Sequence, residues 1–174
     1  KASSGLPAFI MTLAVTSGNT IGFSIASHSG ITYDTTMNKN IVLDTNVLLT
    51  ALKSSRGASF RLLAGLEDGQ YRLNVSTPLV AEYEAVLKRG HLSLSEAQID
   101  DIIDFICAQA THHQIFYLWR PALKDPDDDF ILELAVKAGA SIVTWNTADF
   151  KRASQFAVNV LTPREFLAQL ENTI

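Results

Sequence analysis

Acidic side chains crowd into one short segment of this sequence and give the first indication of its chemistry. Residues 125–129 carry four carboxylates in five positions, and at that spacing the charges repel one another. The positive end of a helix that begins near Asp127 stabilises each acid by roughly 0.3–1 kcal/mol. This stabilisation by the helix end is sufficient to offset the repulsion of two of the four carboxylates. The other two favour a bound divalent cation, because oxygen-rich clusters suit Mg²⁺, Mn²⁺ or Ca²⁺.

Two further segments carry oxygen ligands directly after strand-like runs. Asp44 follows the apolar run of residues 41–43, and Asn46 comes shortly after it. Asn146 and Asp149 follow a second run. In open α/β sheets, ligands bind beyond the carboxyl ends of the strands, so these side chains would meet at one edge. Each of them could instead cap the next helix, and for Asp44 the spacing alone supports both interpretations equally.

A glutamate inside a helical pattern is a weaker candidate. Glu82 lies four residues after Pro78, and most helical glutamates are solvated surface residues. Its neighbours Val80 and Tyr83 make its face of the helix less clearly exposed than that of Glu84. By itself this is only a weak indication of a functional role.

The elements that would position these residues alternate between strand and helix from residue 40 onward. Apolar runs predict strands at residues 40–44, 71–75, 114–118, 141–145 and 157–161. Apolar residues at helical spacing predict helices at residues 46–53, 58–67, 76–87, 93–110 and 127–138. The spacing from Thr162 to Glu165 is that of a capping box and opens a last helix. Strands that alternate with helices predict a parallel sheet covered on both faces.

Composition limits the class of protein. The 174 residues, of which 47% are hydrophobic, suit one domain with a sizeable core. A net charge of −4 argues against binding nucleic acid by overall basicity, although local basic patches remain compatible with it. The single cysteine, Cys107, excludes an internal disulfide framework and favours the reducing cytoplasm. No apolar run reaches the roughly 20 residues of a bilayer-spanning helix, so no membrane role is expected.

Several familiar catalytic motifs are absent from the sequence. It has no glycine-rich loop for nucleotide phosphates, and its four histidines lack the spacing of zinc ligands. A phosphatase of the haloacid dehalogenase type would need aspartate at position 46, where this chain has asparagine. A phosphoryl-transfer receiver domain would need a lysine after a later strand, and none is convincingly placed. The carboxylates therefore remain the principal chemical groups.

Residues 1–36 are interpreted as an N-terminal extension ahead of Met37. Residues 12–27 contain two strand-like runs around Ser17-Gly18-Asn19, a pattern typical of a β-hairpin. The alternative, which we favour, is that Met37 is the natural start and that the extension comes from a tag or a misassigned start site. Every candidate ligand lies after Met37, so the predicted catalytic domain spans residues 37–174.

Four segments together resemble the PIN-domain family, in particular the VapC-like toxins of bacterial and archaeal toxin–antitoxin pairs. They are residues 41–48, 76–83, 125–129 and 142–150. Each segment is a weak signal alone, but the four stand in the family's order at the ends of the expected elements. The resemblance covers residues 39 to about 168. It implies a three-layer α/β/α sandwich with a parallel sheet in the strand order 3-2-1-4-5.

The same resemblance implies a metal-dependent endoribonuclease that uses Mg²⁺ or Mn²⁺. Asp44 matches the first family acid and Glu82 the helical glutamate. Asp128 matches the third acid, with Asp129 as the alternative. Asp44 and Asp128 would bind metal directly, while Glu82 would bind metal or orient the attacking water.

The fourth acidic position departs from the family pattern. The family acid falls where this chain has Asn146, so either Asp149 supplies the fourth metal ligand or Asn146 contributes a carbonyl oxygen. Asn46 would steady Asp44, and Asp125 is a further candidate in the acidic segment. This departure supports an alternative function, in which the chain is a catalytically weak PIN scaffold that binds RNA or a protein partner.

Partners also follow from the resemblance. RNA is the implied substrate, and in-line attack would leave 5′-phosphate and 3′-hydroxyl ends. A cognate antitoxin would cover the active-site groove. These toxins usually dimerise, and the apolar helical stripes of residues 76–89 and 93–110 would support self-association. Basic side chains that could contact RNA phosphates are Lys53, Arg56, Lys88, Arg89, Lys151 and Arg152.

Overall fold

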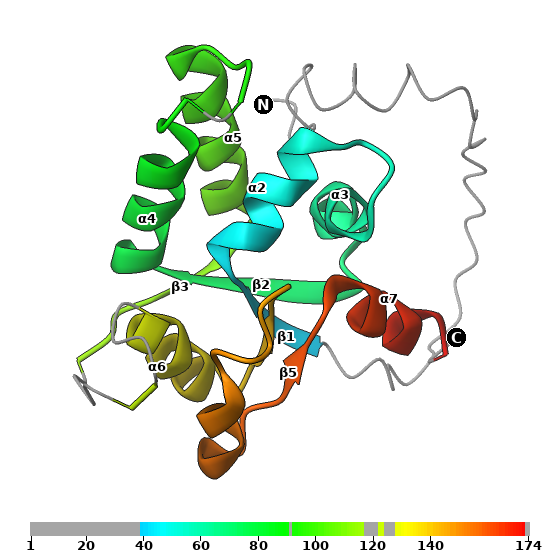
Figure 1. Ribbon diagram of the computed structural model, residues 1–174, viewed down its shortest axis with the longest axis vertical. Coiled ribbons are helices and arrows are strands. Elements are labelled where there is room, and N and C mark those ends of the chain that lie inside the picture. The colour runs from blue at the N-terminus through cyan, green and yellow to red at the C-terminus, as the bar shows by residue number, and fades with distance from the viewer. Residues whose placement is uncertain (1–38, 91, 117–121, 124–127, 173–174) are drawn as a thin grey trace, which may run out of the picture.

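A parallel sheet forms the centre of the computed structural model, which describes residues 39–90, 92–116, 122–123 and 128–172 (Figure 1). Its strands are β1 (Lys39–Leu43), β2 (Tyr71–Ser76), β3 (Thr111–His113), β4 (Ser141–Val143) and β5 (Val160–Leu161). The five strands pair in the order β3-β2-β1-β4-β5, and every pairing is parallel. The predicted strand order 3-2-1-4-5 is therefore confirmed.

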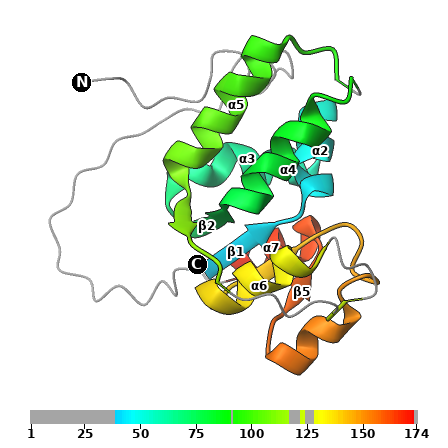
Figure 2. The same ribbon diagram turned by 90° about the vertical axis from the view of Figure 1, so that its left-hand side faces the viewer.

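Helices cover both faces of this sheet. They are α2 (Thr45–Lys53), α3 (Ala58–Ala64), α4 (Thr77–Leu87), α5 (Glu96–Gln109), α6 (Asp129–Ala138) and α7 (Pro163–Glu171), with 3-10 helices η1 (Gly65–Asp68) and η3 (Lys151–Phe156). Figures 1 and 2 show α2 to α5 on one side of the sheet and α6 on the other, where α6 packs across β1, β2 and β4. This arrangement confirms the predicted three-layer α/β/α sandwich.

The central strand β1 shows why the sheet needs both layers. Ile41, Val42 and Leu43 are all buried, and a strand covered on both faces requires an apolar residue at every position. On the side of α6, Ile131 and Leu134 are fully buried against the sheet. The apolar run ends at residue 43, so the first polar side chain of this segment emerges at the carboxyl edge of the sheet.

The two edge strands differ from their predicted positions. The third strand was predicted at residues 114–118, but the structure has it at Thr111–His113, paired with residues 74–76 of β2. An edge strand is paired and covered on fewer sides, so it needs no apolar run, whereas the apolar Phe116 is 77% exposed. The fifth strand begins at Val160 instead of residue 157, because Ala157 adopts a positive φ of 57° and ends the preceding 3-10 helix.

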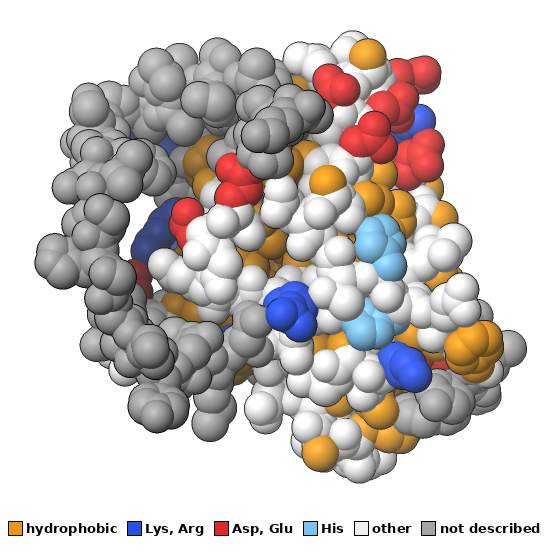
Figure 3. Space-filling view, turned by 180° about the vertical axis from the view of Figure 1, so that it is seen from behind, with side chains coloured by type: hydrophobic (Ala, Val, Ile, Leu, Met, Phe, Trp, Pro, Cys, Tyr) orange, Lys and Arg blue, Asp and Glu red, His pale blue; other side chains and the backbone are white. Residues whose placement is uncertain are grey.

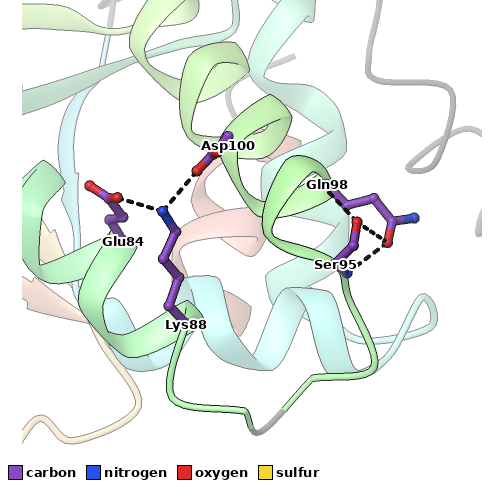
Figure 4. A network of polar contacts seen from close by, with 5 residues as sticks. All are labelled: Glu84, Lys88, Ser95, Gln98 and Asp100. Atoms are coloured by element: carbon purple, nitrogen blue, oxygen red, sulfur yellow. Dashed lines mark hydrogen bonds and ion pairs between the residues drawn. The ribbon is translucent and has the colours of Figure 1, made fainter.

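Polar contacts join α4 to α5 at the end distant from the strand ends (Figure 4). The Lys88 ammonium group lies 2.7 Å from Glu84 Oε1 and 3.0 Å from Asp100 Oδ1. The hydrogen bonds to Glu84 and Asp100 raise the pKa of Lys88 above its ordinary value. The ammonium group thus already has two carboxylate partners, which argues against the predicted RNA contact of Lys88.

At the start of α5, Ser95 and Gln98 form a complete capping box.

Some expectations concern residues that the structure does not describe. The predicted N-terminal extension, residues 1–36, and the candidate ligand Asp125 lie outside the described residues. Among the helices that are described, none has the length and apolar character needed to cross a membrane.

Candidate active site

Asp44 stands at the junction of β1 and α2, at the carboxyl edge of the sheet. Its backbone N–H donates to the Val143 carbonyl at 3.0 Å, which ties it to the end of β4. Its carboxylate caps α2, since Oδ1 accepts from the Asn46 N–H at 3.3 Å. Oδ2 accepts from Asn46 Nδ2 and from Thr144 Oγ1, both at 2.6 Å. Asp44 is therefore a helix cap, one of the two roles that its spacing left open, and the centre of a polar network; its role as a metal ligand stays a prediction.

Burial makes this carboxylate costly to ionise. Asp44 is only 7% exposed, and desolvation raises its pKa, while hydrogen bonds from Thr144 and from the Asn46 and Thr45 backbone partly offset the effect. None of the ion pairs formed within the described residues involves Asp44. A buried anion without a basic partner is favourable when a cation sits beside it.

Thr144 links Asp44 to the segment after β4. Its buried hydroxyl donates to Asp44 and accepts from Asn46 Nδ2 at 3.1 Å and from the Asn146 N–H at 2.9 Å. Asn146 Nδ2 in turn donates to the carboxylate of Asp149. One chain of hydrogen bonds thus joins four predicted site residues. Thr144 was not among the residues predicted from the sequence, although a hydroxyl residue at the end of a strand run is a signal that could have identified it.

Two buried hydroxyl groups lie at the same strand ends. Thr45 Oγ1 begins α2 and Ser76 Oγ ends β2, and neither has a hydrogen-bond partner among the described residues. Buried polar groups are nearly always hydrogen-bonded. Within the described part of the chain, these two hydroxyls are thus polar groups that water or a ligand could satisfy at the carboxyl edge of the sheet.

Glu82 lies on α4, which is anchored beside Asp44. The Tyr83 hydroxyl donates to the carbonyl of Leu43, the residue before Asp44. Burial raises the pKa of Tyr83, and the charges of Asp44 and Glu82 raise it further, so both carboxylates act on this hydroxyl. Glu82 is half-buried, and its Oε2 atom is fully buried. It therefore does not lie on the outer solvent face of the helix.

The neighbouring acids Asp128 and Asp129 have different environments. Asp129 is 0% exposed, and its two carboxylate oxygens accept from the backbone N–H groups of Ala122, at 3.0 Å, and Leu123, at 2.7 Å. Asp128, at the N-cap of α6, is half-buried and makes no capping bond with its side chain. Asp129 holds a loop in place, so the alternative assignment of Asp129 as the third acid is not favoured by its contacts, and Asp128 is the better candidate.

The described residues alone do not make up a metal site. Within the described ranges, no three histidine, cysteine, aspartate or glutamate side chains are close enough together to hold a metal ion. Asp125 and Asp127 lie outside these ranges. The chemistry of the candidates nevertheless suits Mg²⁺ or Mn²⁺, because all are oxygen ligands. No ion pair within the described ranges joins the buried Asp44 to a basic side chain. Convergence of Asp44, Glu82 and Asp128 on one cation remains a prediction.

The basic residues predicted to contact RNA are spread over the surface. Lys53 is the last residue of α2, and Arg89 follows the far end of α4. At about 1.5 Å per residue, both helix ends lie more than about 10 Å from the strand ends. Lys151 and Arg152 begin η3, directly after Asp149 and Phe150. On the face in Figure 3, Lys and Arg side chains are scattered and acidic side chains gather at one end. That face therefore carries no basic groove.

Comparisons with known proteins agree with this geometry. A family model described as "PIN domain" matches residues 40–148. The structure of FitAB bound to an IR36 DNA fragment is similar, with a TM-score of 0.51 and 18% identity over 71% of this chain and 94% of that chain. The crystal structure of PAE2754 from Pyrobaculum aerophilum has a TM-score of 0.51 and 14% identity over 84% of this chain and 99% of that one. At these identities the two structures show the fold alone. No curated protein matches the sequence.

Proposed function

The chain belongs to the PIN-domain family, and from this premise we propose that it is a metal-dependent endoribonuclease. PIN domains are generally nucleases that use divalent metal ions. The observation that carries the proposal is the environment of Asp44. This buried carboxylate lies at the carboxyl edge of a parallel sheet, hydrogen bonds orient it, and it has no basic partner among the residues that the structure describes. Ligands of such sheets bind at this edge.

Four acids are the proposed metal-binding residues. Asp44 and Asp128 would bind Mg²⁺ or Mn²⁺ directly, Glu82 would bind it or hold the attacking water, and Asp149 would fill the fourth position. When bound, such an ion supplies an activated water and stabilises the charge that develops on the phosphate. This assignment is supported by the family match and by the places of Asp44, directly after β1, and of Asp149, on the segment that follows β4.

The protein's own contribution is to hold these carboxylates before substrate arrives. Thr144 and Asn46 each donate to Asp44 Oδ2 at 2.6 Å, which fixes the rotamer of the carboxylate and leaves Oδ1 with one long contact at 3.3 Å. Asn146 orients Asp149 in the same way. Groups that are already oriented lose little entropy when they act, and misplacement by about 1 Å costs a large factor in rate.

Cleavage of a labelled single-stranded RNA tests the proposal directly. We expect cleavage with Mg²⁺ or Mn²⁺, none with excess EDTA, and recovery when metal is restored; the products should end in 5′-phosphate and 3′-hydroxyl groups. A DNA strand of the same sequence is the matched control and should remain uncut. Cleavage that persists in EDTA would exclude the metal mechanism. Binding of RNA without any cleavage would favour the alternative of a catalytically weak scaffold, for which Asn146 in the acid's place is the supporting observation.

We also propose that the chain forms a homodimer and is silenced by a cognate antitoxin, as its resemblance to VapC-like toxins implies. The predicted free apolar stripe does not support this, because Ile99, Ile102 and Ile106 of α5 are buried within the chain. Light scattering at micromolar concentration should nonetheless give about twice the 19.0 kDa of one chain. A mass of one chain at every concentration would contradict the dimer and weaken the toxin assignment.

A further inference from the structure

Trp145 is an exposed aromatic residue at the candidate active site. In the part of the chain that the structure describes, the exposed large hydrophobic side chains are Phe116 and Trp145, and Trp145 is 38% exposed. It directly follows Thr144, whose hydroxyl donates to Asp44. Leaving part of an indole in water forgoes hydrophobic stabilisation. The ring therefore presents an apolar surface to solvent in the residue directly after Thr144, which contacts Asp44.

Two hydrogen bonds hold Trp145 in place. Its backbone N–H donates to Asn46 Oδ1 at 3.1 Å, and Asn46 in turn donates to Asp44. Its indole Nε1–H donates to Ser59 Oγ at 2.8 Å, and Ser59 is a buried residue of α3. Because the polar atom of the ring is satisfied on the protein side, the surface that remains in water is apolar and aromatic. A ring that is already fixed loses little conformational freedom when it binds.

We propose that Trp145 is a platform on which one base of the single-stranded RNA substrate stacks, next to the phosphate that is cut. This inference rests on the proposed function. Unpaired RNA bases stack on aromatic side chains irrespective of their sequence. The net charge of −4 disfavours binding of RNA through its phosphates alone. Stacking on a base does not depend on this charge. Trp145 thus supplies an attraction that does not depend on basic side chains.

Kinetics of three variants test the stacking role. Trp145→Ala should raise KM for RNA about tenfold, within the roughly 5- to 150-fold that one base–aromatic stack contributes, with a smaller change in kcat. Trp145→Phe keeps a ring and should restore KM to within about threefold of wild type. Ser59→Ala keeps the indole and frees its N–H, so it should have an intermediate effect. Thermal melts of all three separate binding from folding: a lower Tm for Trp145→Ala with unchanged KM would overturn the proposal.

An RNA with a single abasic nucleotide, moved along the strand, identifies the stacked base. With the wild-type protein, one abasic position should raise KM about tenfold; with Trp145→Ala, the same abasic position should have no further effect. Independent effects of the mutation and of every abasic position would overturn the proposal, since a stack requires both partners.

A binding measurement keeps the inference separate from the nuclease assignment. Trp119→Phe leaves Trp145 as the only tryptophan of the chain, and its fluorescence should be quenched when single-stranded RNA is added in EDTA. Quenching without cleavage under any metal would contradict the proposed function and support the stacking role. If wild type cuts RNA but RNA does not quench the fluorescence of Trp145 in Trp119→Phe, the nuclease assignment is supported and the stacking role is overturned.

Discussion

Replacing Asp44 with asparagine is expected to reduce RNA cleavage by more than about 100-fold, because even residues that only support metal ligands contribute 10- to 100-fold. Asparagine keeps the shape of the side chain and one oxygen that can accept from Thr144 or Asn46, but it removes the charge that attracts a cation. Cleavage of labelled RNA at saturating Mg²⁺ measures the loss. Asp101→Asn, on the exposed side of α5, is the matched control and should be fully active.

The same variant should keep or gain stability in the absence of metal, and the gain should depend on pH. The pKa of Asp44 is raised above its ordinary value of 3.8 by burial, so the folded protein binds this proton more tightly than the unfolded chain does. Protonated Asp44 therefore contributes stability that is fully present below pH 3.8. This contribution is lost as the pH rises through the pKa that Asp44 has in the folded protein. Asparagine does not titrate, so Asp44→Asn should gain relative to wild type between about pH 4 and pH 7.

Urea unfolding in EDTA at the two pH values checks this expectation. If Asp44→Asn and wild type differed in their free energy of unfolding by the same amount at both pH values, ionisation of Asp44 would not destabilise the folded protein. Added Mg²⁺ or Mn²⁺ should raise the Tm of wild type and of Asp101→Asn but leave that of Asp44→Asn unchanged, because binding to the folded state alone stabilises it. Wild-type activity in Asp44→Asn would end the metal-nuclease assignment.

Replacing Asp129 with asparagine is expected to lower the free energy of unfolding by about 2–4 kcal/mol. Its carboxylate accepts from two backbone N–H groups, and hydrogen bonds to charged groups contribute about 1.5–3 kcal/mol each. An amide has only one acceptor oxygen, so its NH₂ group would face one of these donors in a buried position. Urea unfolding at pH 7 measures the loss.

Asp128→Asn makes the same chemical change one residue earlier and is the matched comparison. Asp128 is half-buried whereas Asp129 is fully buried, so Asp128→Asn should cost less stability than Asp129→Asn, while cleavage falls by more than about 100-fold. The two variants therefore separate the metal-binding role proposed for Asp128 from the structural role of Asp129. If Asp129→Asn were stable and inactive while Asp128→Asn cut RNA normally, the two assignments would have to be exchanged.

Local patterns in the sequence were sufficient for the layers of the fold and for the candidate acids. The apolar run before Asp44 predicts a strand buried on both faces, and the capping box at Thr162 predicts the start of α7, which the structure has at Pro163. Both signals depend on neighbours within a few residues, so they can be read before the chain folds. The alternation of such elements predicts a parallel sheet, whereas the strand order 3-2-1-4-5 was implied by the resemblance of four segments to the PIN-domain family.

Only the tertiary structure decided how the site is assembled. The sequence favoured Asp128 over the adjacent Asp129 only through the family resemblance, and it is the approach of the Ala122 and Leu123 amides that gives Asp129 its structural role. Thr144 meets Asp44 across 100 residues of chain, and the indole of Trp145 reaches Ser59 across 86. Such contacts exist only once β1, β4 and α3 have packed together. Because the energy of a hydrogen bond depends on the position and burial of both partners, local sequence cannot specify which polar groups will meet.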